Sequence, residues 1–226
     1  METTVIAIDG YASTGKSTLS KRLATHLGFT YVDTGYMFRV IALFVIEKNW
    51  LNDNEIILAP LVAALPQLEF SWINQPNGEK QMAVNGKIYG EELRTPQVSN
   101  LVSQVATIPC VRTHLLEQQR ALSKATSVVM DGRDIGTVVF PHAQYKFFLN
   151  ASVAIRAQRR FEEMQVKGIA GNYDDVLANV IERDRLDSSR AIAPLKMAKD
   201  AIAIDTSSLT VDQVFALLCD HFSKGI

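Results

Sequence analysis

The chain has 226 residues, of which 47% are hydrophobic and 21% charged, and its net charge is −1. These are ordinary values for a globular protein with a sizeable core, and without a basic excess a nucleic-acid-binding protein is disfavoured. The longest apolar run, residues 40–46, is far too short to span a bilayer. We therefore expect one domain over residues 1–226 that acts as a monomer on small molecules, without nucleic-acid or membrane partners.

The start of the chain and its cysteines predict a cytoplasmic location. No basic segment followed by an apolar one precedes the first predicted strand, so no secretory signal is expected. The two cysteines, Cys110 and Cys219, lie far apart and do not have the spacing of a metal site. Two isolated thiols in a chain of this length are typical of a reducing compartment.

The first predicted element is a buried strand at residues 5–8, and a glycine-rich loop follows it. Residues 10–17 read Gly-Tyr-Ala-Ser-Thr-Gly-Lys-Ser, which matches the P-loop pattern G-x-x-x-x-G-K-S/T. Apolar residues then recur at helical spacing up to Leu27, and Gly28 is placed to end that helix. A chance glycine loop is the alternative, but strand, loop and helix occur in the order that phosphate binding requires.

In such a loop, backbone N–H groups and the positive end of the helix converge on a chain of phosphates. Lys16 can reach the β- and γ-phosphates, and the Ser17 hydroxyl can bind Mg²⁺. We expect a nucleotide to be bound by Gly10, Tyr11, Ala12, Ser13, Thr14, Gly15, Lys16, Ser17 and Thr18.

Between the loop and residue 95 the pattern changes from α/β to β-rich. A second strand ends at Asp33, a Thr34–Gly35 turn leads into an apolar helix to about Lys48, and another helix is predicted over 53–65. Short strands are predicted at 68–73, 81–84 and 87–89, with turns at Asn77–Gly78 and Asn85–Gly86. We interpret residues 65–95 as a small β-rich insertion.

The second half returns to alternating strands and helices. Helices are predicted from Pro96, from Pro109, over 152–167 and over 173–188, strands over 127–131, 145–149 and 201–204, and a capping box at Thr210–Gln213 before a last helix. With the two earlier strands, this predicts an α/β fold with a five-stranded parallel sheet and helices on both faces. Asp131 ends its strand, where an acid of P-loop proteins helps to hold Mg²⁺ alongside Ser17.

Arginines gather where a second anion would need them, after strand-end turns and on two predicted helices. They are Arg39, Arg133, Arg156, Arg159, Arg160, Arg183 and Arg190, and Asp187 shares the helical spacing of the last two. Ion pairs on a solvated surface, worth only about 0–1 kcal/mol each, are the alternative interpretation. Because guanidinium groups bind phosphate bidentately, arginines facing the P-loop favour a second phosphate-bearing substrate.

Five blocks of residues run in the same order as in a known enzyme family and cover most of the chain. They are Asp33-Thr34-Gly35 with Phe38-Arg39; Val102-Ser103-Gln104-Val105-Ala106 with Val111-Arg112; Asp131-Gly132-Arg133-Asp134 and on to Pro141; Glu182-Arg183-Asp184 with Asp187 and Arg190; and Ala193-Pro194-Leu195. Together they resemble bacterial cytidylate kinase, far more specifically than the P-loop does alone. Tyr11 and Ser13 depart from that family's usual proline and frequent glycine.

The resemblance implies a P-loop kinase fold with a nucleotide-binding insertion at about 65–95 and a short helical lid at about 155–172. It implies ATP as the donor, Mg²⁺ as cofactor, and in-line phosphorylation of CMP and dCMP to CDP and dCDP. The catalytic residues that it implies are Lys16, Arg133, Arg159 and Arg190. The CMP-binding residues that it implies are Thr34, Arg112 and Asp134 at the cytosine, Ser103, Arg183 and Asp187 at the sugar, and Arg39, Arg133 and Arg190 at the phosphate.

Other functions stay open at this point. A kinase for UMP, AMP or another phosphorylated metabolite would use the same loop, although Asp134 and Arg112 suit the N4 donor and ring acceptors of cytosine. A nucleotide-dependent switch would leave the second set of arginines without a use, and no guanine-reading Asn-Lys-x-Asp stretch occurs. A purely structural protein would have no use for Lys16 in a phosphate loop.

Overall fold

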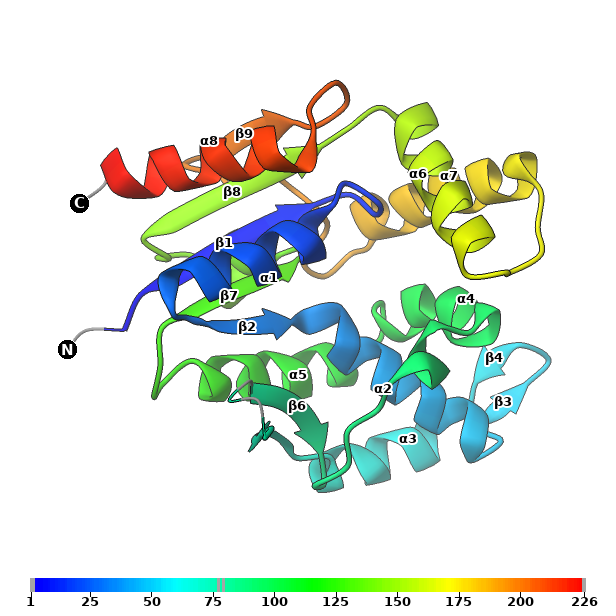
Figure 1. The fold of residues 1–226 in the computed structure, drawn as a ribbon. Coiled ribbons are helices and arrows are strands. Elements are labelled where there is room, and N and C mark those ends of the chain that lie inside the picture. The colour runs from blue at the N-terminus through cyan, green and yellow to red at the C-terminus, as the bar shows by residue number, and fades with distance from the viewer. Residues whose placement is uncertain (1–2, 77, 79, 225–226) are drawn as a thin grey trace. The chain divides into compact units, whose positions relative to one another are not determined.

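The structure, a computed structural model, describes residues 3–76, 78 and 80–224 and is drawn in Figure 1. The chain divides into two compact units, Met1–Tyr31 with Ser127–Ile226, and Val32–Thr126. In the described part of the chain, no helix combines the length and the apolar character that crossing a membrane requires.

The first unit is built on a parallel sheet. Its elements are β1 (Val5–Gly10), α1 (Lys16–Leu27), β7 (Val128–Gly132), the π-helical turn η3 (Ile135–Val139), β8 (Tyr145–Asn150), α6 (Val153–Val166), α7 (Tyr173–Ser189), β9 (Ile202–Asp205) and α8 (Val211–Lys224). With β2 (Thr30–Asp33), these strands form a five-stranded sheet in the order β2-β7-β1-β8-β9. Strand β1 pairs in parallel with β7 and β8, and β8 with β9. The predicted α/β class is confirmed.

The core of this unit fixes the strand that leads into the P-loop. Ile6 and Ile8 of β1 are fully buried and pack with Leu23 of α1 and Leu218 of α8. Helices α1 and α8 run side by side along the sheet in Figure 1. Burial of each Ile or Leu side chain is worth about 1.5–3 kcal/mol, so the end of β1 is held firmly.

Helices of the first unit begin and end close to their predicted positions. Gly28, at φ 68, ends α1 in the left-handed conformation that favours glycine. Before α8, the Thr210 N–H donates to Gln213 Oε1 at 2.8 Å and the Gln213 N–H donates to Thr210 Oγ1 at 3.2 Å. The predicted capping box is therefore present.

The second unit is mainly helical. Its elements are α2 (Thr34–Glu47), β3 (Leu51–Asn52), β4 (Glu55–Ile56), α3 (Leu58–Ala64), η1 (Leu65–Gln67), β5 (Phe70–Asn74), β6 (Lys80–Val84), η2 (Glu91–Arg94), α4 (Pro96–Val105) and α5 (Pro109–Leu122). Helix α2 packs against α4 and α5, and β5 pairs antiparallel with β6. The segment read as an insertion, residues 65–95, thus contains a two-stranded hairpin flanked by two short 3₁₀ helices.

The predicted helix over residues 53–65 is wrong in its first part. Strands β3 and β4 form a hairpin there, with Asp53 and Asn54 at φ 47 and φ 66. Aspartate and asparagine tolerate left-handed backbone better than most residues, and two in succession are typical of a type I′ hairpin turn. The helix begins only at Leu58.

The Thr34–Gly35 turn is also wrong, because both residues lie inside α2. Asp33 is the last residue of β2, and its side chain caps α2 by accepting from the Tyr36 N–H at 3.1 Å. A strand therefore passes directly into a helix without a separate turn.

The Asn85–Gly86 turn is present, with φ 50 and φ 78, but the strand predicted after it is not. Within the described residues that follow, Lys87 makes an isolated bridge to Val84 and residues 88–90 are not in a strand. Asn77, part of the other predicted turn, lies outside the described residues.

Candidate active site

The P-loop begins at Gly10, the last residue of β1, where there is no room for a side chain. Gly10 has φ 149, and a Cβ atom there would lie 2.0 Å from the carbonyl oxygen of Leu149. Gly15, at φ 85, precedes α1. Ser13 has φ 59, a conformation that costs a residue other than glycine about 1–2 kcal/mol. The loop therefore holds backbone strain where the phosphates are expected.

Lys16 is buried inside this loop, and its Nζ donates to the carbonyl oxygen of Tyr11. Burial lowers the pKa of Lys16 well below its ordinary value, and the charge of Arg133 lowers it further. The carboxylates of Asp131 and Asp9 act in the opposite direction. Lys16 is therefore within electrostatic reach of the ends of both β1 and β7.

Asp131 is the last residue but one of β7 and lies next to Ser17, as the sequence predicts. Its Oδ2 accepts from Ser17 Oγ at 2.9 Å, and its Oδ1 accepts from the Tyr31 hydroxyl at 2.9 Å. A carboxylate and a hydroxyl are hard oxygen ligands of the kind that Mg²⁺ takes in kinases, where substrate phosphates and water complete its shell. The donor set fits Mg²⁺.

Four charged residues form a network just after β7. Arg133 Nε donates to Asp187 Oδ2 at 2.7 Å, and Asp187 Oδ1 lies 3.8 Å from Arg190 Nη1. Arg190 Nη2 lies 3.5 Å from Asp134 Oδ1. Asp134, Asp187 and Arg190 are all buried. Four of the predicted CMP-binding residues therefore lie in contact with one another.

The charges of this network compensate one another. Burial raises the pKa of Asp187, but the charges of Arg133, Arg183 and Arg190 outweigh burial, and the pKa lies below its ordinary value. Burial lowers the pKa of Arg133, yet the carboxylate of Asp187 outweighs it and the pKa is raised. Arg183, half-buried on α7, also lowers the pKa of Lys16 and so acts on both parts of the site.

The sequence had suggested that Arg190 shares a helix face with Arg183 and Asp187, but in the structure it does not. Helix α7 ends at Ser189, and Arg190 is extended, with φ −62 and ψ 141. Its Nε donates to the carbonyl oxygen of Ala193 at 2.6 Å. This local turn, rather than helical spacing, directs Arg190 toward Asp134 and Asp187.

Arg156, the first arginine of α6, contacts the P-loop. It is 2% exposed and forms a bidentate pair with Asp184 at 3.0 and 2.5 Å. Its Nη1 also donates to the carbonyl oxygen of Ala12 at 3.4 Å, and its guanidinium carbon lies 5.0 Å from the centre of the Tyr11 ring. Arg156 thus connects α6 and α7 to the loop.

The other two arginines of α6 have different surroundings. Arg159 donates to the carbonyl oxygen of Thr206 at 2.6 Å and to its Oγ1 at 3.1 Å. The same hydroxyl donates to the Thr14 carbonyl oxygen at 3.4 Å, so Arg159 is one residue away from the loop. Arg160 lies on the surface, 3.5 Å from Glu163. The group predicted as a lid is therefore not uniform.

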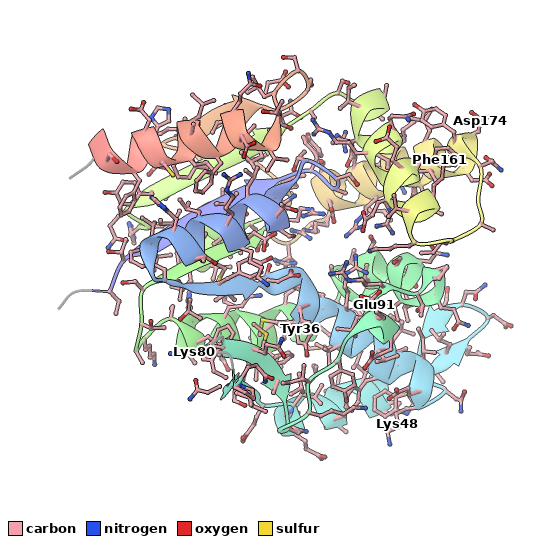
Figure 2. All side chains as sticks on the ribbon, in the orientation of Figure 1. Tyr36, Lys48, Lys80, Glu91, Phe161 and Asp174 are labelled. Atoms are coloured by element: carbon pink, nitrogen blue, oxygen red, sulfur yellow. The ribbon has the colours of Figure 1, made fainter. Side chains whose placement is uncertain are left out.

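Helix α6, which contains most of the predicted lid at about 155–172, packs against α7, which begins just after it. Figure 2 shows their side chains, with Phe161 of α6 and Asp174 of α7 labelled. The rings of Phe161 and Tyr173 meet edge to face, with centroids 6.1 Å apart. Such a contact is worth roughly 0.5–1.5 kcal/mol beyond burial and ties the two helices together.

The second unit contains the remaining predicted CMP-binding residues, Thr34, Arg39, Ser103 and Arg112. Thr34 at the start of α2, Ser103 on α4 and Arg112 on α5 are buried. Arg112 Nη1 donates to the carbonyl oxygen of Ala106 at 3.2 Å. Arg39 Nη1 donates to the carbonyl oxygen of Leu93 at 3.1 Å. Hydrogen bonds therefore orient both arginines.

From the sequence, no role was expected for Asp9, and Arg156 was expected only among the arginines suited to a second anion and within the bounds of the lid, about 155–172. Asp9 is 4% exposed and precedes the last residue of β1, a glycine, just as Asp131 precedes the last residue of β7, so a signal for it was present in the sequence. The contact of Arg156 with Ala12 joins residues 144 positions apart and leaves no local pattern.

Comparisons with known proteins show the family of this chain. Residues 6–224 match the protein family described as "Cytidylate kinase". The cytidylate kinase of Flavobacterium johnsoniae is 47% identical over 222 residues, which cover 97% of this chain and 96% of that protein. That of Pasteurella multocida is 44% identical over 222 residues, covering 98% and 96%.

The chain belongs to the cytidylate kinase family. As a cytidylate kinase it is an ATP-dependent nucleoside monophosphate kinase whose substrates are nucleotides, and it phosphorylates CMP and dCMP. The fold also resembles that of an uncharacterized protein from Eubacterium ventriosum, with a TM-score of 0.51, 13% identity and 99% of each chain covered. At that identity the likeness concerns the fold alone.

Proposed function

We propose that the chain transfers the γ-phosphoryl group of ATP in line to the phosphate of CMP or dCMP with the residues assigned below. One observation carries this proposal. Lys16 in the P-loop and the network of Arg133, Asp187 and Arg190 adjoin the carboxyl ends of two paired parallel strands, β1 and β7. Ligands of open α/β sheets bind at that edge, and two cationic centres there suit two phosphate groups.

The donor ATP is assigned to the P-loop. Its phosphates would accept from backbone N–H groups of residues 10–18 and lie at the N-terminus of α1, where the helix dipole favours negative charge. Lys16 would contact the β- and γ-phosphates. Arg156 supports this assignment because it holds the Ala12 carbonyl oxygen and so keeps the loop in one shape.

Mg²⁺ is assigned to Ser17 and Asp131, whose oxygens lie together at 2.9 Å. When bound, the ion would neutralise charge on the β- and γ-phosphates. Tyr31 donates to the other oxygen of Asp131 and so helps to orient that carboxylate.

The acceptor nucleotide is assigned to the residues that the resemblance to cytidylate kinases implies. For its phosphate we propose Arg39, Arg133 and Arg190; for its sugar, Ser103, Arg183 and Asp187; and for its cytosine, Thr34, Arg112 and Asp134. The Arg133–Asp187 pair, in which Asp187 is buried, supports this set because it presents a guanidinium beside a carboxylate that can accept from a sugar hydroxyl.

The choice of cytosine follows from donor and acceptor chemistry. A carboxylate at Asp134 accepts from the N4 amino group, and a guanidinium at Arg112 donates to N3 and O2. Uracil would place its O4 acceptor against the carboxylate and leave a buried charge unpaired. Polar sites of this kind discriminate by as much as roughly 10⁴-fold.

No general base is needed, because the second pKa of a phosphate monoester is about 6 and the acceptor is largely dianionic at neutral pH. Catalysis then consists of in-line positioning and charge stabilisation by Lys16, Arg133, Arg190 and, on the lid, Arg159. We propose that the lid, about 155–172, excludes water from the transfer, and that residues 65–95 form a nucleotide-binding insertion in a single kinase domain.

We further propose a monomer that acts in the cytoplasm on free nucleotides, without nucleic-acid or membrane partners. The net charge of −1 and the free thiols of Cys110 and Cys219 support this. Light scattering after gel filtration tests the monomer.

A coupled assay of ADP release with ATP and a panel of CMP, dCMP, UMP and AMP tests the proposed recognition. CMP and dCMP should give the highest kcat/KM, and Asp134→Ala should reduce the preference for CMP over UMP more than it raises the KM for ATP. Equal losses with CMP and UMP would remove Asp134 from base recognition.

A further inference from the structure

Asp9, at the end of β1, reaches across to the segment that follows β7. Its Oδ1 accepts from the Ile135 N–H at 2.8 Å, and its Oδ2 accepts from the Gly136 N–H at 2.7 Å. These are the first two N–H groups of η3, which begins directly after Asp134. The carboxylate therefore holds the start of this turn from another strand.

The first N–H groups of a helical turn have no partner inside it and are usually capped by the residue that precedes the turn. Here that residue is Asp134, at φ −141, and its side chain makes no capping hydrogen bond. Asp9 takes over the capping of η3. The carboxylate of Asp134 is directed elsewhere, with Oδ1 at 3.5 Å from Arg190 Nη2.

The rest of the turn is also tightly held. The carbonyl oxygen of Asp134 accepts from Val138 N at 2.9 Å and from Val139 N at 3.1 Å. A Cβ atom on Gly136 would lie 3.2 Å from Lys146 Cδ and 3.4 Å from Asp9 Oδ2, so this residue has little room to move. Single π-helical turns are frequent at functional sites.

We propose that Asp9 is a positioning residue for pyrimidine recognition: by accepting from the Ile135 and Gly136 N–H groups it keeps the carboxylate of Asp134 in its place. The inference rests on the proposed function, which assigns Asp134 to the N4 amino group of cytosine. Asp9 itself touches no substrate. Its effect on substrate choice passes through Asp134.

The test is a double-mutant cycle of Asp9→Asn and Asp134→Asn, with kcat/KM measured for CMP and UMP and KM for ATP. Asparagine keeps one acceptor oxygen but turns an N–H₂ group toward one of the two backbone donors, so one hydrogen bond is lost. Since a misplacement of about 1 Å can cost roughly 10²-fold, Asp9→Asn should lower the CMP/UMP ratio of kcat/KM about tenfold or more. In the Asp134→Asn background the same change should alter that ratio by less than about twofold, because residues coupled through a shared backbone shift are not additive.

Two measurements separate positioning from a general loss of structure. Asp205→Asn is the matched control, since Asp205 also ends a strand of this sheet and accepts a backbone N–H, that of Ser207 at 2.8 Å. It should leave the CMP/UMP ratio unchanged. Hydrogen exchange should show faster exchange of the Ile135 and Gly136 amides in Asp9→Asn, without any nucleotide present.

If Asp9→Asn does not fold, Gly136→Ala tests the same turn, because its new methyl group would press on Lys146 and Asp9. It should lower the CMP/UMP ratio in the wild-type background and not in Asp134→Asn. Effects that add in the cycle, equal losses for CMP and UMP, or unchanged exchange at Ile135 and Gly136 would overturn the inference.

Failure of the inference is distinguishable from failure of the proposed function. If Asp134→Asn alone leaves the CMP/UMP ratio unchanged, Asp134 does not read the base and both ideas fall. If Asp134→Asn lowers the ratio and Asp9→Asn does not, only the role of Asp9 is wrong.

Discussion

Two neighbouring strands of the sheet each have a carboxylate as the last residue but one, and the two carboxylates have very different partners. On β7, Asp131 accepts from two hydroxyl groups, those of Ser17 and Tyr31. On β1, Asp9 accepts from two backbone N–H groups. A hydroxyl can rotate and exchange one partner for another, whereas a backbone N–H is fixed by the chain. Asp131 is therefore suited to take a metal ion, and Asp9 is suited to hold a loop still.

Burial has a marked electrostatic consequence for Asp9. Burial of Asp9 outweighs the bonds from Gly136 and Ile135 and raises its pKa to about 6. A charge that costs this much is kept only where its geometry is needed, as expected for a residue that sets the position of others. The carboxylates of Asp9 and Asp131 both act to raise the pKa of Lys16, so Lys16 is coupled electrostatically to both strands.

The largest expected effect comes from removing the ammonium group of Lys16, whose pKa is affected by the carboxylates of both Asp9 and Asp131. Lys16→Met keeps most of the buried stem and removes the ammonium group, so kcat should fall roughly 10²–10³-fold, as for the loss of one donor that stabilises a transition state. The midpoint of thermal unfolding should change little, because no cavity is created. Steady-state kinetics and thermal denaturation check the two statements, and an unchanged kcat would remove Lys16 from the mechanism.

The next effect concerns the pH dependence of stability. Because the pKa of Asp9 is raised from 3.8 to about 6 on folding, the folded state favours its protonated form. This contribution is fully present below pH 3.8 and is lost as the pH rises through about 6, amounting to about 2–3 kcal/mol. Urea unfolding between pH 3 and 8 should show that the free energy of unfolding of the wild type, relative to that of Asp9→Asn, falls by this amount as the pH rises.

Asp187 provides the internal contrast, because its pKa is lowered by Arg133, Arg183 and Arg190 against the effect of burial. Its contribution is present above its ordinary pKa and is lost as the pH falls through the lowered value, outside the window of Asp9. A difference between wild type and Asp9→Asn that stays flat from pH 4 to pH 6 would contradict the assignment for Asp9.

Magnesium dependence distinguishes the two carboxylates directly. Asp131→Asn should raise the Mg²⁺ concentration for half-maximal activity, and 10–100-fold is the range in which such changes to a metal site commonly fall. Asp9→Asn, assayed at saturating CMP, should leave that concentration within about twofold, because backbone N–H groups occupy its oxygens. A shift of equal size in both variants would erase the distinction drawn between β1 and β7.

The smallest effect is expected from a partner of Asp131. Tyr31→Phe removes the hydroxyl that donates to Oδ1 at 2.9 Å, and the half-maximal Mg²⁺ concentration should rise about threefold to tenfold as the carboxylate loses orientation. Tyr173→Phe, which loses a weaker hydroxyl contact of 3.5 Å to the Ala154 carbonyl, is the matched control. Identical curves for the two variants would argue against an orienting role for Tyr31.

Local chemistry explains what could be predicted from the sequence. The P-loop before α1, the end of β7 next to Asp131 and the Thr210–Gln213 cap each depend on residues within a few positions, and each is found within one residue of its predicted place. The β3–β4 hairpin was missed because Asp53 and Asn54 adopt left-handed backbone that their side chains only permit. A residue type that merely tolerates a left-handed backbone is a weaker sequence signal than a glycine at a position such as Gly10, where only glycine fits.

The unpredicted parts of the site depend on distant pairs. Asp9 and Ile135 are 126 positions apart, and Arg156 and Ala12 are 144 apart. No periodicity or spacing records such contacts, because they form only when strands from different parts of the chain become neighbours. Arg190 was expected on a helix face and instead depends on a turn with Ala193 at φ 48, a conformation rare for alanine.

The most direct measurement is a crystal structure of the chain with CMP and a non-hydrolysable ATP analogue. We predict the N4 amino group of cytosine within about 2.7–3.2 Å of an Asp134 carboxylate oxygen, and the phosphates of the analogue around Lys16. A cytosine that contacts neither Asp134 nor Arg112, with CMP bound at full occupancy, would contradict it.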